Sequence, residues 1–434
     1  MRALAQKKVF VPFLVLALVA AAVLGGLIGD AKGLKPQKLS EAQKAYLMSV
    51  YNETWNYLAA FVEPETGLPF DSDAKQPATS MSNVGLYLTS AAIAYRTGLI
   101  SAEEGQGRVE KALASLEKIE TWHGFPRPWV LVRSLKPTFG EEFSYGSHLA
   151  NLIGGLTVAS TTFPETAARI QRFLSTMEFR SLYDAKSGWL RGGYNVKTKD
   201  FAIFQPWGPW YYKFFASETR LLSFYLIARK AAPKEHWAGL IRPVQEIEGE
   251  KYFTEGYEPG GLFTQYSAGL FLDERNTEMG ESQRAYARSQ MKHAKKIGAP
   301  VWGWSVSEDS HGRYLAAGEL RDEIVAPYAS VLAVIYFPVE VTDNLKELEK
   351  LGARPRLADD GQTRAFGFKD SLNWKTRAVS KHTLTPSQAM AFLSLANALF
   401  DGVVWRSFAE DPIVQRGLRI LEWKHTKPRS FYTL

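Results

Sequence analysis

Cysteine is absent from this chain of 434 residues. Its absence excludes disulfide bonds, thiolate nucleophiles, cysteine-ligated zinc and the lipidated cysteine that anchors a bacterial lipoprotein. The seven histidines show neither HxxxH nor HExxH spacing, which argues against a histidine zinc site. A GxSxG nucleophile elbow and a Walker A loop are missing as well. We therefore expect a protein that needs no metal and no organic cofactor.

Long runs of basic residues are also missing. The formal charge is +7, but Arg2, Lys7 and Lys8 lie in the N-terminal tail, so the remainder is nearer +4 (7 minus 3). Basic and acidic residues alternate along that remainder, so we expect no nucleic-acid partner. Aromatic residues are abundant instead: 12 Trp, 19 Tyr and 25 Phe make up 13% of the chain. Flat rings stack on sugars, but a large helical core also uses many rings, and the count alone favours neither interpretation.

The N-terminus carries one apolar segment that could cross a bilayer. Residues 9–28 (VFVPFLVLALVAAAVLGGLI) contain no charge over 20 residues, the length that a transmembrane helix needs. The basic residues before it favour a cytoplasmic N-terminus, with the rest of the chain outside. A cleaved signal peptide is the alternative, because small residues near 20–26 could form a cleavage site.

This segment sets the expected organisation of the chain. We expect a signal anchor or signal peptide over residues 1–29, a linker over 30–40 and one exported domain over 41–434. The domain would be a monomer in the periplasm or another extracytoplasmic space. Its N-terminal helix would tether it to the inner membrane, unless cleavage releases it.

Beyond residue 40 the sequence predicts helices joined by aromatic loops rich in Gly and Pro. Apolar residues recur at helical spacing, and Ser101 with Glu104 forms a capping box. The predicted helices cover residues 41–62, 82–96, 101–121, 147–161, 164–175, 217–231, 237–246, 261–272, 282–297, 327–336, 342–351, 385–399 and 412–423. Segments 125–146, 188–214 and 299–314 are too long and too aromatic to be simple connectors. This pattern favours a single all-α domain built from concentric helix pairs.

Acidic residues in the aromatic loops are candidates for glycoside cleavage. That reaction needs a carboxylic acid to protonate the leaving oxygen and a carboxylate on the other face of the sugar. Glu218 follows the rings of WGPWYYKFF and opens a predicted helix, although it could equally offset the helix dipole or pair with Arg220. Glu308 and Asp309 share a loop with two Trp and a His, and could instead belong to a solvated loop.

Three further acidic sites are weaker candidates. Glu141 and Glu142 are flanked by aromatic residues and could raise each other's pKa, as a general acid requires, or could cap the next helix. Asp71 and Asp73 lie in another Gly/Pro loop, and Asp322–Glu323 precedes the apolar turn APYAS.

Several of these loops resemble blocks of the bacterial glycoamylase-like family. That family includes endo-β-1,2-glucanases, and a related domain occurs in cyclic β-1,2-glucan synthases. The similarity starts at TGLPFDSDAKQPATS and continues, in the family's order, through FASETRLLSFYLIARKAAPKEHW, GAPVWGWSVSEDSHGRY, EIVAPYASVL, AFGFKDSLNW and DGVVWRSFAEDP, roughly residues 60–412. The resemblance implies an (α/α)6 barrel that acts on a β-glucan, plausibly β-1,2-linked.

The resemblance also carries over individual residues. It implies an acid in the segment ASETR, which is Glu218. The family's W-G-x-[ST]-x-S-[DE] loop matches at Trp302, Gly303, Ser305, Ser307 and Glu308, and G-L-x-x-D matches at Gly67, Leu68 and Asp71.

Two departures separate this chain from the family pattern. Where relatives carry an acid in a block like S-T-V-D, this chain has Tyr145 or Ser147, so Glu141 or Glu142 would have to substitute. Where the synthases have a Glu in GTMFEY, this chain has Gln265, which argues against transglycosylation.

The sequence therefore predicts a hydrolase of an envelope or extracellular β-glucan, with a polysaccharide or oligosaccharide as its partner. The alternatives are a non-catalytic glycan-binding protein of polysaccharide assembly or export, and a transglycosylase or lyase. Glu218 is the first catalytic candidate, and Glu142 and Glu308 are candidates for the second. The predicted substrate-binding residues are Asp71, Tyr145, Trp207, Trp210, Arg220, Gln265, Trp302, Trp304, Asp309 and Tyr328.

Overall fold

The computed structural model describes residues 39–138, 142–144, 146–201, 210–255, 261–315, 323–359 and 362–423. They belong to one compact unit, Lys38–Leu434. The predicted membrane segment, residues 9–28, lies outside the described residues. Within the described ranges, no single helix has the length and apolar composition of a membrane span, although the bent pair 385–399 and 403–409 passes that test together.

Two kinds of helix alternate along the described chain. Helices of the first kind bury only part of their surface: α2 (Glu41–Ala60), α4 (Ala102–Leu116), α6 (Pro164–Ser175), α8 (Glu235–Gly239), α10 (Glu278–Ile297) and α12 (Pro338–Lys350). Helices of the second kind are buried on most sides: α3 (Met81–Arg96), α5 (Gly146–Thr162), α7 (Arg220–Ala228), α9 (Leu262–Tyr266), α11 (Pro327–Leu332) and α13 (Thr385–Leu399). We call the first kind the outer helices and the second kind the inner helices. Along the described chain, each outer helix is followed by an inner one.

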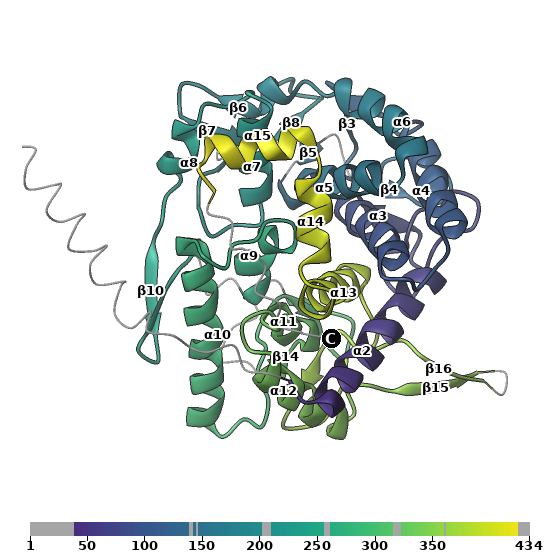
Figure 1. Cartoon of the computed structure of the whole chain (residues 1–434), viewed down its shortest axis with the longest axis vertical. Coiled ribbons are helices and arrows are strands. Elements are labelled where there is room, and N and C mark those ends of the chain that lie inside the picture. Colours follow the sequence, from purple (N-terminus) through teal and green to yellow (C-terminus); the bar gives the residue numbers. More distant parts are fainter. Residues whose placement is uncertain are drawn as a thin grey trace, which may run out of the picture. The chain divides into compact units, whose positions relative to one another are not determined.

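The inner helices pack on one another, as Figure 1 shows for α3, α5, α11 and α13. The closest pair is α3 and α5, because glycines lie where the two backbones meet. A Cβ on Gly155 would lie 2.1 Å from the carbonyl oxygen of Gly85, so neither position accepts a side chain. Helix α14 (Val403–Ala409), which the sequence did not predict, packs against α5, α13 and α3, and α15 (Pro412–Ile420) packs against α7.

Short antiparallel strands occupy the loops. The pairs are β1 (Ala78–Ser80) with β4 (Trp129–Leu131), β2 (Thr121–Trp122) with β3 (Phe125–Pro126), β5 (Glu142–Ser144) with β8 (Gly193–Asn195), β10 (Val244–Ile247) with β11 (Glu250–Phe253), β12 (Ser307–Glu308) with β13 (Tyr314–Leu315), β14 (Ile324–Val325) with β17 (Leu372–Asn373) and β15 (Arg356–Asp359) with β16 (Gln362–Ala365). The three-stranded sheet orders β6 (Tyr183–Asp184), β7 (Trp189–Arg191) and β9 (Tyr211–Tyr212). Short 3-10 helices cover Phe179–Leu182 and Ala268–Leu270.

The helical architecture predicted from the sequence is confirmed for the described residues, with one segment wrong. The helix predicted over 237–246 ends at Gly239, and strand β10 begins at Val244. Pro243 between them has no N–H to continue a helix, and Gln245 and Ile247 alternate with exposed Val244 and Glu246 as a strand requires. The single-domain organisation over residues 41–434 stays a prediction.

Candidate active site

Acidic side chains gather at the N-terminal ends of the inner helices. Asp71 accepts a hydrogen bond of 2.7 Å from the side-chain amide of Asn83, in the first turn of α3. Its backbone carbonyl accepts one of 2.9 Å from the N–H of Thr385, the first residue of α13. Burial, and then the charge of Glu308, raise the pKa of Asp71. The loop after α2 thus brings one carboxyl group to the start of two inner helices.

Asp370 and Glu308 lie beside Asp71 on this side of the site. The Asp370 side chain is 1% exposed, and its Oδ2 accepts a hydrogen bond of 2.6 Å from the backbone N–H of Glu308. Its other oxygen, Oδ1, is buried and has no hydrogen-bond partner within the described residues. Glu308 is held in turn by His382, whose backbone N–H and Nδ1 lie 3.1 and 2.9 Å from Oε1.

This environment favours the protonated form of Asp370. Burial raises its pKa to about 7, and the charges of Glu308 and Asp71 add to the effect, although the Ser387 hydroxyl and the Glu308 N–H oppose it. A carboxyl group that exchanges its proton near neutral pH, with one oxygen free of partners, suits proton transfer.

A second pair of acids lies at the start of α7. Glu218 belongs to the turn that precedes the helix and is half-buried, and Glu255 follows β11. The Oε1 atom of Glu255 is buried and has no hydrogen-bond partner among the described residues. Burial, and then the charge of Glu218, raise the pKa of Glu255 well above its usual range.

Two tyrosines connect these acids. Burial and the charges of Glu218 and Glu255 raise the pKa of Tyr212, so this phenol faces the pair. Tyr314 projects from β13 with 67% of its side chain exposed. Desolvation, and then the charges of Asp370, Glu218 and Asp71, raise its pKa. The charges of acids from both groups therefore act on Tyr314.

The structure thus brings together three residues predicted from the sequence: Glu218, Glu308 and Asp71. The Glu142 backbone lies in β5 opposite Asn195, and its side chain lies outside the part of the chain that the structure describes. Tyr145 and Trp207 also lie outside the described residues. Trp210 is 36% exposed beside β9.

Three predicted substrate-binding residues are buried and hydrogen-bonded within the protein, so they do not fit that role: Arg220, Asp309 and Gln265. Arg220 is fully buried and forms two hydrogen bonds of 2.8 and 2.9 Å with Glu274, not with Glu218. Asp309 is 2% exposed and bonds Arg313. The Gln265 amide donates to the carbonyl of Phe253 and is 2% exposed.

Three predicted aromatic contacts are also part of the packing. Trp304 has no exposed surface, so no sugar can stack on it, and Trp302 is 6% exposed. Tyr328 is buried, and its hydroxyl donates to the carbonyl of Val306 at 2.8 Å, which fixes the loop that carries Glu308. These rings therefore support the loop that carries Glu308 and do not contact a ligand.

Glu255 and Asp370 are the site residues that the sequence analysis missed. Glu255 lies in TEGYEPGG and Asp370 in AFGFKDSLNW, and both sequences contain aromatic residues and glycines. The criterion that selected Glu218 and Glu308, an acid among aromatic residues in a loop, would have selected these two as well.

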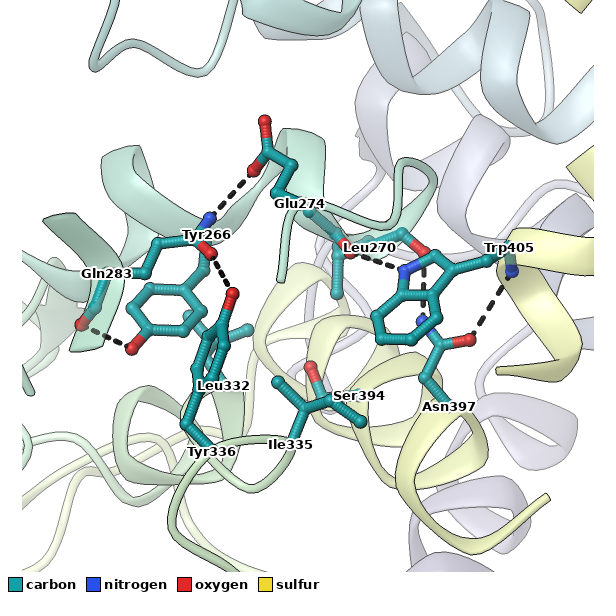
Figure 2. A pocket seen from close by; sticks show the side chains of 11 residues that line it. Tyr266, Leu270, Glu274, Gln283, Leu332, Ile335, Tyr336, Ser394, Asn397 and Trp405 are labelled. Atoms are coloured by element: carbon teal, nitrogen blue, oxygen red, sulfur yellow. Dashed lines mark hydrogen bonds between the residues drawn. The ribbon is translucent and has the colours of Figure 1, made fainter. Parts of the chain in front are cut away.

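A separate cavity lies at the opposite ends of the inner helices. It is lined by Tyr266 at the end of α9, Leu332 at the end of α11 and Asn397 near the end of α13 (Figure 2). It offers ≈ 20 Å³ to the centres of water-sized molecules, which is room for water but not for a sugar ring. Figure 2 shows Glu274 bonded to Gln283 at its edge, so the cavity borders the network that holds Arg220.

Comparisons with known proteins confirm the family resemblance seen in the sequence. Residues 212–412 match the model of the Glycoamylase family, described as "putative glucoamylase", and residues 50–206 match a family described as a protein of unknown function. A cyclic β-(1,2)-glucan synthase of Rhizobium meliloti is 26% identical over 275 residues. That match spans 57% of this chain but only 9% of the synthase.

Solved structures share the fold. An endo-β-1,2-glucanase from Chitinophaga pinensis, solved with sophorotriose and glucose, superposes with a TM-score of 0.74 at 19% identity, covering 88% of this chain and 98% of that one. An endo-β-1,2-glucanase from Talaromyces funiculosus, solved with sophorose, gives a TM-score of 0.61 at 12% identity over 88% and 90% of the two chains. This chain therefore has the helical fold of these enzymes.

Proposed function

We propose that this protein is a glycoside hydrolase that cleaves a β-1,2-linked glucan, and that its six helix pairs close an (α/α)6 barrel around the site. The observation that supports the proposal is that acids of two groups, Glu218 of the first and Asp370 and Asp71 of the second, act through their charges on the same side chain, Tyr314. Glycoside cleavage needs two such groups. The substrate class is supported by the fold shared with two endo-β-1,2-glucanases and by the similarity to a cyclic β-(1,2)-glucan synthase.

Glu218 is the proposed general acid and Asp370 the carboxylate that acts from the other side. Glu218 is half-buried in the turn before α7, and its charge acts on both Glu255 and Tyr314, so it would protonate the leaving oxygen from this side of the site. Asp370 has one oxygen without a partner among the described residues, and its pKa of about 7 makes it a stronger base than an ordinary carboxylate. Because its side chain is only 1% exposed, it would act through a water rather than by direct attack on the anomeric carbon, and inversion of the anomeric configuration in the first product tests this route.

Export is part of the same proposal. It rests on residues 9–28, whose uncharged length fits a membrane helix, and on the basic residues before them. An extracytoplasmic hydrolase would meet a glucan that is too large to enter the cell.

The test is product analysis with linear and cyclic β-1,2-, β-1,3- and β-1,4-glucans. We expect oligosaccharides from β-1,2-glucan, and their loss in Glu218→Gln and Asp370→Asn. Glu246→Gln is the matched control, because Glu246 is exposed on β10 and pairs with Lys251 at 3.7 Å. No product from any glucan would overturn the hydrolase. Binding without product would instead favour the glycan-binding alternative, and a new linkage or an unsaturated end would favour a transglycosylase or a lyase.

A further inference from the structure

The Glu308 carboxyl group is held through one of its two oxygens. The backbone N–H of His382 donates a hydrogen bond of 3.1 Å to Oε1, and the imidazole Nδ1 of the same residue lies 2.9 Å from that atom. Among the described residues, neither of these bonds reaches Oε2. Because the side chain keeps 12% of its surface exposed, Oε2 is the oxygen that can still accept a hydrogen bond from a ligand.

The backbone of Glu308 is fixed separately from its side chain. Its N–H donates a hydrogen bond of 2.6 Å to Oδ2 of Asp370, and its carbonyl accepts one of 2.5 Å from the Ser371 hydroxyl. These bonds determine where the side chain begins, but they leave its torsions free. The two bonds from His382 therefore determine where the carboxyl group points.

His382 is itself held by residues other than Glu308. Its carbonyl accepts a hydrogen bond of 2.8 Å from the Ser380 hydroxyl, and the N–H of the next residue, Thr383, donates one of 2.9 Å to Oδ1 of Asp73. A carboxylate oxygen accepts hydrogen bonds, so the imidazole donates to Glu308 through a proton on Nδ1. The imidazole is thus a fixed donor rather than a side chain that follows the carboxyl group.

Tyr314 lies directly opposite Glu308 in the β12–β13 pair. Side chains at directly opposite positions of an antiparallel pair project from the same face, with Cβ atoms about 4.5–5.5 Å apart. The Tyr314 side chain is 67% exposed. An exposed ring, on which a sugar can stack, therefore lies beside a carboxylate oxygen that can accept a hydrogen bond from a sugar hydroxyl.

We propose that His382 is a positioning residue that holds the Glu308 carboxylate by Oε1, so that Oε2 binds a hydroxyl group of the sugar unit stacked on Tyr314. This inference rests on the proposed function and deepens it, because it assigns Glu308 to substrate binding rather than to bond cleavage. A hydrogen bond to an ionised acceptor is about twice as strong as one between neutral groups. That contribution is lost when the carboxylate rotates away, although His382 itself does not touch the sugar.

The experiment measures KM and kcat of the full-length wild type, Glu308→Ala, His382→Leu and His382→Asn on β-1,2-glucan. Leucine fills the space beside Glu308 but donates no hydrogen bond, whereas the asparagine amide places an N–H close to the position of Nδ1. We expect His382→Leu to raise KM about tenfold with kcat changed by less than about threefold, the size expected for one hydrogen bond to a charged group. His382→Asn should restore most of the wild-type KM.

The double variant Glu308→Ala/His382→Leu shows whether His382 acts through Glu308. If it does, His382→Leu should add less than about twofold to the KM of Glu308→Ala, because the effects of coupled residues do not add. The matched control is His293→Leu, which removes an imidazole on α10 whose Nδ1 lies 3.3 Å from Oε1 of Glu248, and it should keep the wild-type KM. Additive effects, an unchanged KM in His382→Leu or a loss confined to kcat would overturn the proposal while leaving the hydrolase intact.

Two measurements keep the proposal testable if no glucan is cleaved, an outcome that would overturn the proposed function. Nitrogen-15 NMR of histidine-labelled wild type should show a proton fixed on Nδ1 of His382, and absence of that proton would refute the inference on its own. Calorimetry with a β-1,2-linked oligosaccharide then gives Kd in place of KM. Binding about tenfold weaker in His382→Leu than in the wild type would support the proposal, and equal binding or none would overturn it.

Discussion

The substitution Asp370→Asn tests two effects of the Asp370 carboxyl group: its part in catalysis and its effect on the free energy of unfolding. Burial raises the pKa of Asp370 from 3.8 to about 7. Between these two values the folded protein holds a proton that the unfolded chain has lost, so stability falls as pH rises through this window and stays reduced above pH 7. Three pKa units correspond to about 4 kcal/mol, and the side chain is 1% exposed, so solvent screening is small. Asparagine carries no charge at any pH, so the Asp370→Asn variant does not lose stability as the pH rises through this window.

We expect Asp370→Asn to be more stable than the wild type at pH 8 by about 1–3 kcal/mol. The gain stays below the limit of about 4 kcal/mol because the new amide has no evident acceptor among the described residues, and a buried unsatisfied group costs about 1–3 kcal/mol. Near pH 4, where the wild-type carboxyl group keeps its proton and the gain disappears, the cost of the amide remains, so the variant should be less stable than the wild type by about 1–3 kcal/mol. If Asp370 takes part in proton transfer, kcat should fall by about 10²–10⁴ in the same variant.

The assay is urea unfolding at several pH values from 4 to 8, with Asp309→Asn as the matched control. Asp309 is equally buried, but hydrogen bonds from the N–H groups of Arg313 and His311 and from the Arg313 side chain outweigh its burial and lower its pKa. Its stabilisation is present above the unfolded pKa, so Asp309→Asn should lose stability at pH 8. Parallel pH dependences for wild type and Asp370→Asn would refute a raised pKa at Asp370.

Two further substitutions test the other assignments. Arg220→Met should lower the free energy of unfolding by about 3–5 kcal/mol, measured by urea unfolding, because it leaves the Glu274 carboxylate buried and unpaired. A variant with normal stability and a raised KM would instead support the substrate contact that the sequence predicted for Arg220. Tyr314→Ala should change stability by less than about 0.5 kcal/mol, since the side chain is 67% exposed, but should raise KM for the glucan; an unchanged KM would remove Tyr314 from the substrate path.

The helices could be predicted from the sequence because their periodicity is local. The inner helices α3 and α13 are apolar almost all round, and α10 carries its buried residues on one face. The β10–β11 hairpin was missed because the apolar residues Trp237, Leu240 and Ile241 lie at helical spacing and extended a helical pattern across Pro243. Pairing across a hairpin depends on a partner strand that periodicity within one segment does not reveal.

The aromatic rings of the loops show a second limit of sequence reasoning. Trp304 and Trp210 occur in similar loops of rings and glycines, yet the first is fully buried and the second is 36% exposed. The difference comes from α10, where the side-chain amide of Gln290 bonds both the N–H and the carbonyl of Trp304 at 2.9 Å. The aromatic composition of the loops favoured a carbohydrate-binding surface, but it did not show which rings are exposed on that surface.

The acids show why the site itself was only half predicted. Asp309 and Asp370 are the same residue type with nearly the same burial, but their pKa values shift in opposite directions. The donors to Asp309 lie within four residues of it, so its structural role can be inferred from the segment DSHGR. Asp370 receives its N–H from Glu308, 62 residues earlier, and its Oδ1 receives no hydrogen bond from the described residues.

An acid in an aromatic loop that has no donor within a few residues is therefore the stronger catalytic candidate. By this criterion Asp370 ranks above Asp309, whose donors lie in the segment DSHGR. Since a buried carboxyl group without local donors must hold a proton or find a ligand, the fold retains such groups at a cost in stability that only their chemistry explains.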